Sequence, residues 1–167
     1  TAQLAAMGFD ALGVDLSEEG ISTARRQYVG HSPRFQVGDV LRLPLRDSFD
    51  CVFTRSCSLY NDAGFHELTA VTDALLNYVK PGGVLIFDYF SRLRRGSDST
   101  TWRYHSMQDL QRHFAVYPQV QTYFSLRLDA VVLGRFALTQ PTSRIAMALS
   151  ALSGMGGELI AIVRKSG

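Results

Sequence analysis

Residues 9–19 read FDALGVDLSEE, and this stretch decides the fold of the chain. Its apolar run begins at Phe9 and ends on the carboxylate of Asp15, which is typical of a buried strand that reaches one edge of a sheet. Ser17 then stands where the N-cap of a helix belongs, and the two acids after it suit the positive end of the helix dipole. The stretch therefore predicts a strand followed directly by a helix, which we expect to end near Tyr28.

The alternation of strand and helix continues along the chain. Residues 1–7 predict a helix that ends at Gly8. The other expected strands are 34–37, 49–54, 84–88, 122–128 and 158–163, the expected helices are 64–79, 106–114 and 141–152, and a turn is expected at 80–83. Strands that are apolar along their whole length belong to parallel sheets that helices cover on both faces. The sequence therefore predicts an α/β fold with a largely parallel sheet.

Composition excludes several classes of protein. The chain has 167 residues, of which 46% are hydrophobic, and this suffices for one domain with a buried core. A net charge of +2 gives no electrostatic reason to expect a nucleic-acid or membrane partner. The apolar runs are far shorter than the roughly 20 residues that a membrane-spanning helix needs.

Cys51 and Cys57 lack the number and spacing of metal ligands, so we expect reduced thiols and no metal. No signal-peptide pattern is present, so a cytoplasmic location is expected.

Three carboxylates close predicted strands, namely Asp15, Asp39 and Asp88. The carboxyl ends of parallel strands meet at one edge, and ligands of open α/β sheets bind there. A carboxylate at such a strand end can accept hydrogen bonds from both ribose hydroxyls of an adenosine cofactor. Asp39 is placed to accept from an adenine amino group, while the backbone of Val40 meets the edge of the ring. The pattern predicts adenosine binding but does not separate NAD from S-adenosylmethionine.

Four motifs resemble the class I S-adenosylmethionine-dependent methyltransferases, in particular their small-molecule, type 11-like group. The motifs are GVDLS at 13–17, GDV at 38–40, LPLRDSFD at 43–50 and VKPGGVL at 79–85. Each motif is common alone, but their order and spacing match the family over roughly half of the chain. The resemblance implies a Rossmann-like doubly wound sheet, mostly parallel, with an antiparallel C-terminal strand. It also implies one domain over residues 1–167, with S-adenosylmethionine as the methyl donor and S-adenosylhomocysteine as the product.

The resemblance also assigns residues to the methyl donor. It places Asp15 at the ribose and Asp39 and Val40 at the adenine, and it counts Leu16 among the donor-binding residues. The segment that borders the methionine and the methyl group in the family corresponds here to residues 54–61, and it contributes Thr54, Arg55 and Ser56. A general base is needed only for a poorly nucleophilic acceptor, so the lack of an obvious catalytic pair does not argue against activity.

Two residues are weaker catalytic candidates. Tyr60 could orient a methyl acceptor, although a half-buried packing aromatic is the simpler interpretation. His66 could accept a proton near neutral pH, but a solvated or capping histidine suits the start of a predicted helix better. We assign no role to His105 or His113, which lie on or beside the helix expected at 106–114 and have no obvious partner.

The first strand of the family and its GxGxG loop do not occur in the sequence. Residues 1–6 resemble the helix that directly follows that loop. The missing strand would lie centrally in the sheet, and its neighbours would be left with unpaired edges. We therefore expect a domain that is incomplete at its N-terminus, with a degenerate domain as the alternative.

The leading functional hypothesis is methyl transfer to a small-molecule acceptor, whose identity the sequence leaves open together with the oligomeric state. A noncatalytic domain of the same fold that acts as a scaffold is the first alternative. A nicotinamide-dependent oxidoreductase shares the ribose carboxylate, but the spacing of the GDV and PGG motifs disfavours it.

Nucleic acid is disfavoured as the acceptor, because residues 54–57 do not match the Pro-Pro-aromatic pattern of amino-methylating enzymes. The basic residues that could bind phosphate are Arg92, Arg94, Arg95 and Arg103, and a solvated loop explains them more simply.

Overall fold

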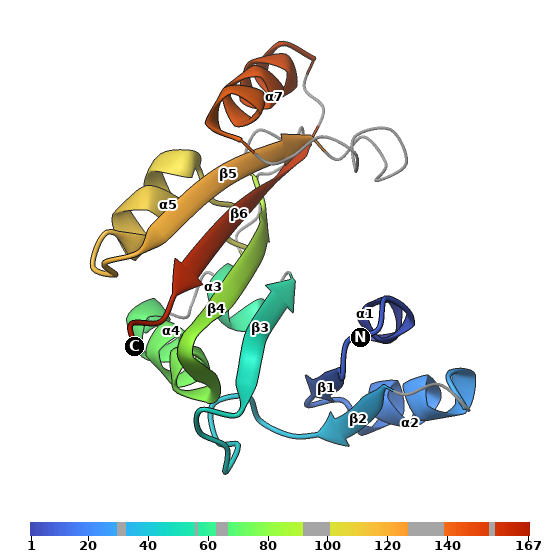
Figure 1. Ribbon diagram of the computed structural model, residues 1–167. Coiled ribbons are helices and arrows are strands. Elements are labelled where there is room, and N and C mark those ends of the chain that lie inside the picture. The colour runs from blue at the N-terminus through green and yellow to red at the C-terminus, as the bar shows by residue number, and fades with distance from the viewer. Residues whose placement is uncertain (30–32, 56, 63–66, 92–100, 127–138, 154–155) are drawn as a thin grey trace. The chain divides into compact units, whose positions relative to one another are not determined.

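The computed structural model describes residues 1–29, 33–55, 57–62, 67–91, 101–126, 139–153 and 156–167. They form two compact units, residues 1–45 and residues 46–167, which are described separately. Helices alternate with strands in both units (Figure 1). The α/β class is therefore confirmed, whereas the expectation of a single, N-terminally incomplete domain stays a prediction. None of the helices in the described ranges is long and apolar enough to cross a membrane.

The first unit contains a two-stranded parallel sheet and two helices. Its elements are α1 (Ala2–Ala6), β1 (Leu12–Asp15), α2 (Glu18–Gln27) and β2 (Arg34–Val37). Strands β1 and β2 pair in parallel, with Asp15 opposite Val37. Ser17 caps α2 as expected, because its hydroxyl accepts a hydrogen bond from Gly20 N at 3.0 Å. The cap fixes the start of α2 two residues after the end of β1.

Strand β1 is shorter than the sequence predicted. Gly8, at a φ of 93°, ends the turn after α1, and Phe9 N donates back to Leu4 O at 3.1 Å. This bond uses the backbone of Phe9 for the end of the helix, so that residue cannot join the strand. The strand begins only at Leu12.

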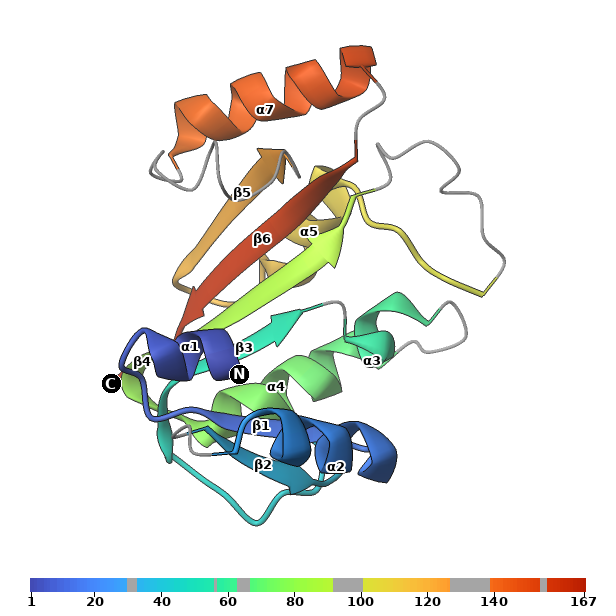
Figure 2. The same ribbon diagram turned by 90° about the vertical axis from the view of Figure 1, so that its right-hand side faces the viewer.

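The second unit contains a four-stranded sheet in the order β3-β4-β6-β5 (Figure 2). Its elements are β3 (Phe49–Arg55), α3 (Ser58–Asn61), α4 (Leu68–Tyr78), β4 (Val79–Phe90), α5 (Met107–Phe114), β5 (Val120–Leu126), α7 (Gln140–Ser153) and β6 (Gly157–Arg164). Strands β3 and β4 are parallel, whereas β6 runs antiparallel to both β4 and β5. The antiparallel C-terminal strand of the class I methyltransferase fold is therefore confirmed.

Most boundaries in this unit shift by a few residues from the prediction, and two features differ in kind. The turn expected at 80–83 lies inside β4, where Phe49 pairs with Val79 but Cys51 already pairs with Val84. Glycine is required there, because Gly82 has a φ of 78° and a Cβ on Gly83 would lie 2.7 Å from the carbonyl oxygen of Asp50. Helix α3 was not predicted, since four residues are too few to show a helical period.

The core of the second unit is a group of aromatic rings on one face of β4. The fully buried ring of Phe87 lies 4.7 Å from the ring of Tyr60 in α3 and 4.9 Å from the ring of Phe114 in α5. Tyr89, two residues along the strand, stacks on Phe87 with centroids 5.7 Å apart. Helices α3 and α5 therefore cover the same face of β4, and the rings that join them lie near the carboxyl end of this strand.

Candidate functional site

The first unit brings two predicted carboxylates to one edge of its sheet. Asp15 is the last residue of β1, and its backbone oxygen accepts a hydrogen bond from Gly38 N at 2.9 Å. This bond holds the end of β2 beside the end of β1, so that Asp39 follows at the same edge. The two carboxylates thus meet where parallel strands end, which is where open α/β sheets bind their ligands.

Local hydrogen bonds orient both carboxylates. Ser17 N donates to Asp15 Oδ1 at 2.8 Å, and none of the described residues bonds Oδ2 of the same side chain. Leu41 N donates to Asp39 Oδ1 at 2.9 Å, and Arg42 Nε lies 3.5 Å from Asp39 Oδ2. The second oxygen of Asp15 is therefore available to a hydroxyl donor, whereas both oxygens of Asp39 already have neighbours.

Apolar side chains accompany the carboxylates. Leu16, directly after Asp15, is 72% exposed, and Val40, directly after Asp39, is half-buried. An exposed leucine beside an oriented carboxylate suits a ligand that combines a flat ring with hydroxyl groups. Four of the predicted donor-binding residues thus lie together in the first unit.

The other predicted donor-binding residues belong to the second unit. Thr54 and Arg55 end β3, and Ser56 lies outside the described residues. Arg55 is tied to neighbouring strands, because its Nη2 lies 2.9 Å from Glu158 Oε1 and its Nε 3.4 Å from the buried Asp88 Oδ2. The hydrogen bond to Glu158 raises the pKa of the guanidinium above its usual value. The ion pairs of Arg55 with Asp88 and Glu158 therefore link β3 to β4 and β6.

Tyr60 lies in α3 and is fully buried. Its hydroxyl oxygen is 3.0 Å from Thr72 Oγ1, and Thr72 donates its own proton to Leu68 O at 2.8 Å. Tyr60 is therefore the donor to Thr72, and burial raises the pKa of its hydroxyl far above the usual value. The side chain is thus buried and bonded within the protein, as the packing interpretation expects. The other weak candidate, His66, lies outside the described residues.

Two histidines that have no role in the sequence analysis are bonded to this tyrosine and to its partner Thr72. His105 Nε2 lies 3.0 Å from Tyr60 O, which can only accept, so the nitrogen carries the proton. His113 Nε2 lies 3.0 Å from Thr72 Oγ1. Because the proton of Thr72 goes to Leu68, His113 donates here, and its Nδ1 is left as an acceptor when the ring is neutral.

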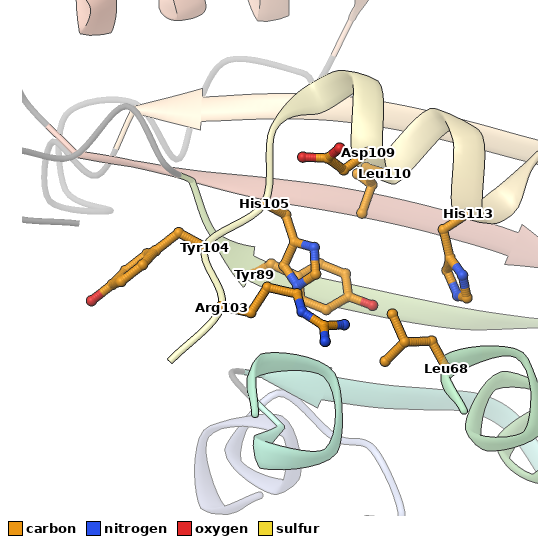
Figure 3. Close-up of a pocket in the computed structure, with 8 residues that line it drawn as sticks. All are labelled: Leu68, Tyr89, Arg103, Tyr104, His105, Asp109, Leu110 and His113. Carbon is orange, nitrogen blue, oxygen red and sulfur yellow. The ribbon is translucent and has the colours of Figure 1, made fainter. Parts of the chain in front are cut away.

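These histidines line a pocket of about 250 Å³ within the second unit (Figure 3). Its walls are Leu68 of α4, Tyr89 of β4, the segment Arg103, Tyr104 and His105, and the α5 residues Asp109, Leu110 and His113. One sequence feature indicates the side of the pocket that α5 forms. Ser106 and Asp109 form a capping box that fixes the start of α5, and the buried Leu110 then predicts that His113, three residues later, shares the same face.

The protonation of His113 should make stability depend on pH. Burial lowers the pKa of its imidazole from the usual 6.5, and the nearby His105 lowers it further, against a smaller opposing effect of Asp73. The unfolded chain then binds more protons, so the free energy of unfolding should fall as the pH drops through about 6.5 towards the folded pKa. Urea denaturation between pH 5 and 8 measures this loss. The H113Q variant should lose less over the same range, and equal losses would contradict the assignment.

Comparison with known proteins identifies the family of the chain. A family model described as a methyltransferase domain matches residues 1–87, just over half of the sequence. The chain belongs to this methyltransferase family. Methyltransferases of the family use S-adenosylmethionine, so the enzyme class and the methyl donor expected from the sequence are confirmed.

Solved structures share the fold of this methyltransferase at low sequence identity. Phosphoethanolamine N-methyltransferase 2 of Haemonchus contortus, in complex with S-adenosyl-L-methionine, is 14% identical with a TM-score of 0.62, over 99% of this chain and 46% of that one. The 1,6-didemethyltoxoflavin-N1-methyltransferase of Burkholderia thailandensis is 15% identical with a TM-score of 0.60, over 99% of this chain and 65% of that one. The cyclase SpnF is 15% identical with a TM-score of 0.61, over 98% of this chain and 70% of that one.

At these identities the structural likeness establishes the fold alone. A cyclase is among the neighbours, so the fold does not fix the reaction, and the chemistry has to be argued from the site. No curated protein matches the methyltransferase significantly.

Proposed function

We propose that the methyltransferase transfers the methyl group of S-adenosylmethionine to a small-molecule acceptor. The observation that carries this proposal is the pair of carboxylates, Asp15 and Asp39, at the shared edge of two parallel strands. Both lie within the residues that match the family. Asp15 would hold the ribose hydroxyls through its available Oδ2, and Leu16 would cover the adenine ring.

The residues present fit an adenosine group. A carboxylate with one oxygen already fixed by Ser17 N is oriented before the ligand arrives, which reduces the entropy lost on binding. Asp39 is fixed in the same way by Leu41 N, and together with Val40 it would meet the edge of the adenine. Thr54 and Arg55 would border the methionine, as the resemblance implies.

The chain itself has little chemistry to perform in the reaction. When bound, the donor supplies a methyl group that its positive sulfonium already activates for in-line displacement. The protein has to bind the acceptor, orient its nucleophilic atom and exclude water. The described residues contain no cluster of potential metal ligands.

A small acceptor is favoured over nucleic acid. Arg103, the one described member of the basic group, lines a pocket of small volume, while Arg92, Arg94 and Arg95 lie outside the described residues. Two solved neighbours are named for small substrates, phosphoethanolamine and 1,6-didemethyltoxoflavin. The cytoplasmic location expected from the sequence stays a prediction, with which two free cysteines agree.

Calorimetry with S-adenosylhomocysteine tests the proposal on the intact protein. We expect saturable binding of one ligand per chain, and no heat in a parallel titration with NAD. A protein that binds neither ligand at millimolar concentration would be a scaffold, and the proposal would be wrong. Binding of NAD alone would identify the oxidoreductase instead.

A further inference from the structure

We propose that the pocket between β4, α4 and α5 binds the methyl acceptor, and that this acceptor is a planar aromatic molecule carrying a hydroxyl group. The inference rests on the proposed function, because it assigns the pocket to the acceptor of that reaction. It extends that function by naming the chemical class of the substrate and the two side chains that recognise it, Tyr89 and His113.

The place of the pocket supports this assignment. Tyr89 directly follows Asp88, which is the β4 residue paired with Arg55 at the end of β3. The pocket therefore opens at the carboxyl end of the parallel strands of its unit, where ligands of α/β sheets bind. Its wall is also continuous with α3, because His105 Nε2 donates to Tyr60 O at 3.0 Å. Residues 54–61, which the resemblance to the family assigns to the methyl group, include α3.

Tyr89 presents its hydroxyl to the pocket, and no group in the described part of the chain is bonded to it. The residue is only 3% exposed, yet none of the described side chains or backbone groups hydrogen-bonds its oxygen. Burial raises the pKa of this hydroxyl well above its usual value, so it stays protonated. Figure 3 shows the hydroxyl directed towards the space that Leu68 and Arg103 border. Because this hydroxyl reaches the pocket, it can donate a hydrogen bond to a polar group of a ligand bound there.

His113 supplies the complementary acceptor. Its Nε2 proton is committed to Thr72, and no bond from the described residues reaches its Nδ1. Burial lowers the pKa of the imidazole, so the ring is neutral near pH 7 and Nδ1 can accept a proton. A ligand with an acidic O–H satisfies both groups, since it donates to Nδ1 and accepts from Tyr89.

The rest of the lining suits a flat ring. Four of the eight lining residues are aromatic, namely Tyr89, Tyr104, His105 and His113, and the rings of Tyr89 and His105 lie 5.0 Å apart at 54°. Aromatic walls favour an aromatic guest through stacked and edge-to-face contacts. A volume of about 250 Å³ limits the guest to one or two rings.

Methyl transfer from the sulfonium to the hydroxyl of such an acceptor is balanced in atoms and charge. The aryl oxygen forms a bond to the methyl carbon while the bond between that carbon and sulfur breaks, and its electron pair stays on sulfur. The hydroxyl proton passes to His113 Nδ1 and then to solvent. A phenol and the sulfonium thus yield a methyl ether, a neutral thioether and one proton.

Binding of 2-naphthol to the intact protein saturated with S-adenosylhomocysteine tests the inference. We expect 2-naphthol to bind at least about tenfold more tightly than naphthalene, which lacks the hydroxyl, and than decahydro-2-naphthol, which lacks the flat ring. The Y89F and H113Q variants should each reduce the preference for 2-naphthol over naphthalene several-fold. Both changes are conservative, and a merely structural role would lower the affinity for both ligands equally.

A blocking variant locates the site. Trp in place of Leu68 should fill the pocket and abolish 2-naphthol binding, whereas Trp in place of the exposed neighbour Thr69 should leave it unchanged. If L68W fails to fold, Y89F and H113Q decide the question. Equal binding of decahydro-2-naphthol, or an unchanged preference in both conservative variants, would overturn the inference.

The outcomes also separate this inference from the proposed function. Binding of S-adenosylhomocysteine without binding of 2-naphthol leaves the methyltransferase in place and removes the aromatic acceptor. Binding of 2-naphthol without binding of S-adenosylhomocysteine overturns the assignment of the pocket to an acceptor.

Discussion

Replacement of Asp15 by alanine is expected to weaken the binding of S-adenosylhomocysteine by about 1.5–3 kcal/mol, or roughly 10- to 150-fold in Kd. The carboxylate is oriented by Ser17 N at 2.8 Å, and its Oδ2 is available to the ribose hydroxyls. Hydrogen bonds to a charged group are stronger than those between neutral groups, which sets the size of the effect. Calorimetry on the intact protein measures the change.

Asp10 provides the matched control for this substitution. It precedes the opposite end of β1, where its Oδ1 lies 3.1 Å from Arg34 Nη2 in a pair whose side chains are 79% and 62% exposed. An exposed pair of this kind contributes little to stability. The D10A variant should therefore bind the ligand as the parent protein does. If D10A and D15A lose affinity equally, or if neither loses any, the ribose is bound elsewhere.

The placement of Asp15 and Asp39 at one edge of the sheet was predictable because its signals are local. Ser17 and the two acids after it place the start of α2, and the strand before them ends on Asp15 within the same short stretch. The neighbouring carboxylate, Asp39, needs only the parallel pairing of two adjacent strands, which the alternation of elements already indicates. Chain order and local pattern together therefore suffice to place these two carboxylates.

The pocket was not predictable, because it depends on contacts between distant segments. His105 is held by a carbonyl 45 residues earlier in the chain, and His113 by a hydroxyl 41 residues earlier. Neither Tyr60 nor Thr72 carries a pattern that marks it as the partner of a histidine. The helix that contains Tyr60 has four residues and was not predicted. Only the packing of α3, α4 and α5 on β4 brings these groups together.

Replacement of Phe87 by alanine is expected to cause the largest loss of stability, about 3–5 kcal/mol in the free energy of unfolding. The ring is fully buried and contacts rings from three other positions, with centroids 4.7 Å away at Tyr60, 4.9 Å at Phe114 and 5.7 Å at Tyr89. Its removal deletes buried apolar area and leaves a cavity that these large side chains cannot close. Urea denaturation followed by near-ultraviolet circular dichroism measures the loss.

Phe53, on the adjacent strand β3, separates burial from the mere loss of a phenyl ring. Its side chain is 48% exposed, so the F53A variant should lose less than half as much stability as F87A. Equal losses would show that the aromatic group on β4 is not the core of the second unit. The ring of Phe87 also supports the pocket, because the rings of Tyr60 and Tyr89 pack against it. Tyr60 in turn is bonded to His105 and, through Thr72, to His113. F87A should therefore weaken 2-naphthol binding even under conditions where the variant remains folded, whereas F53A should not.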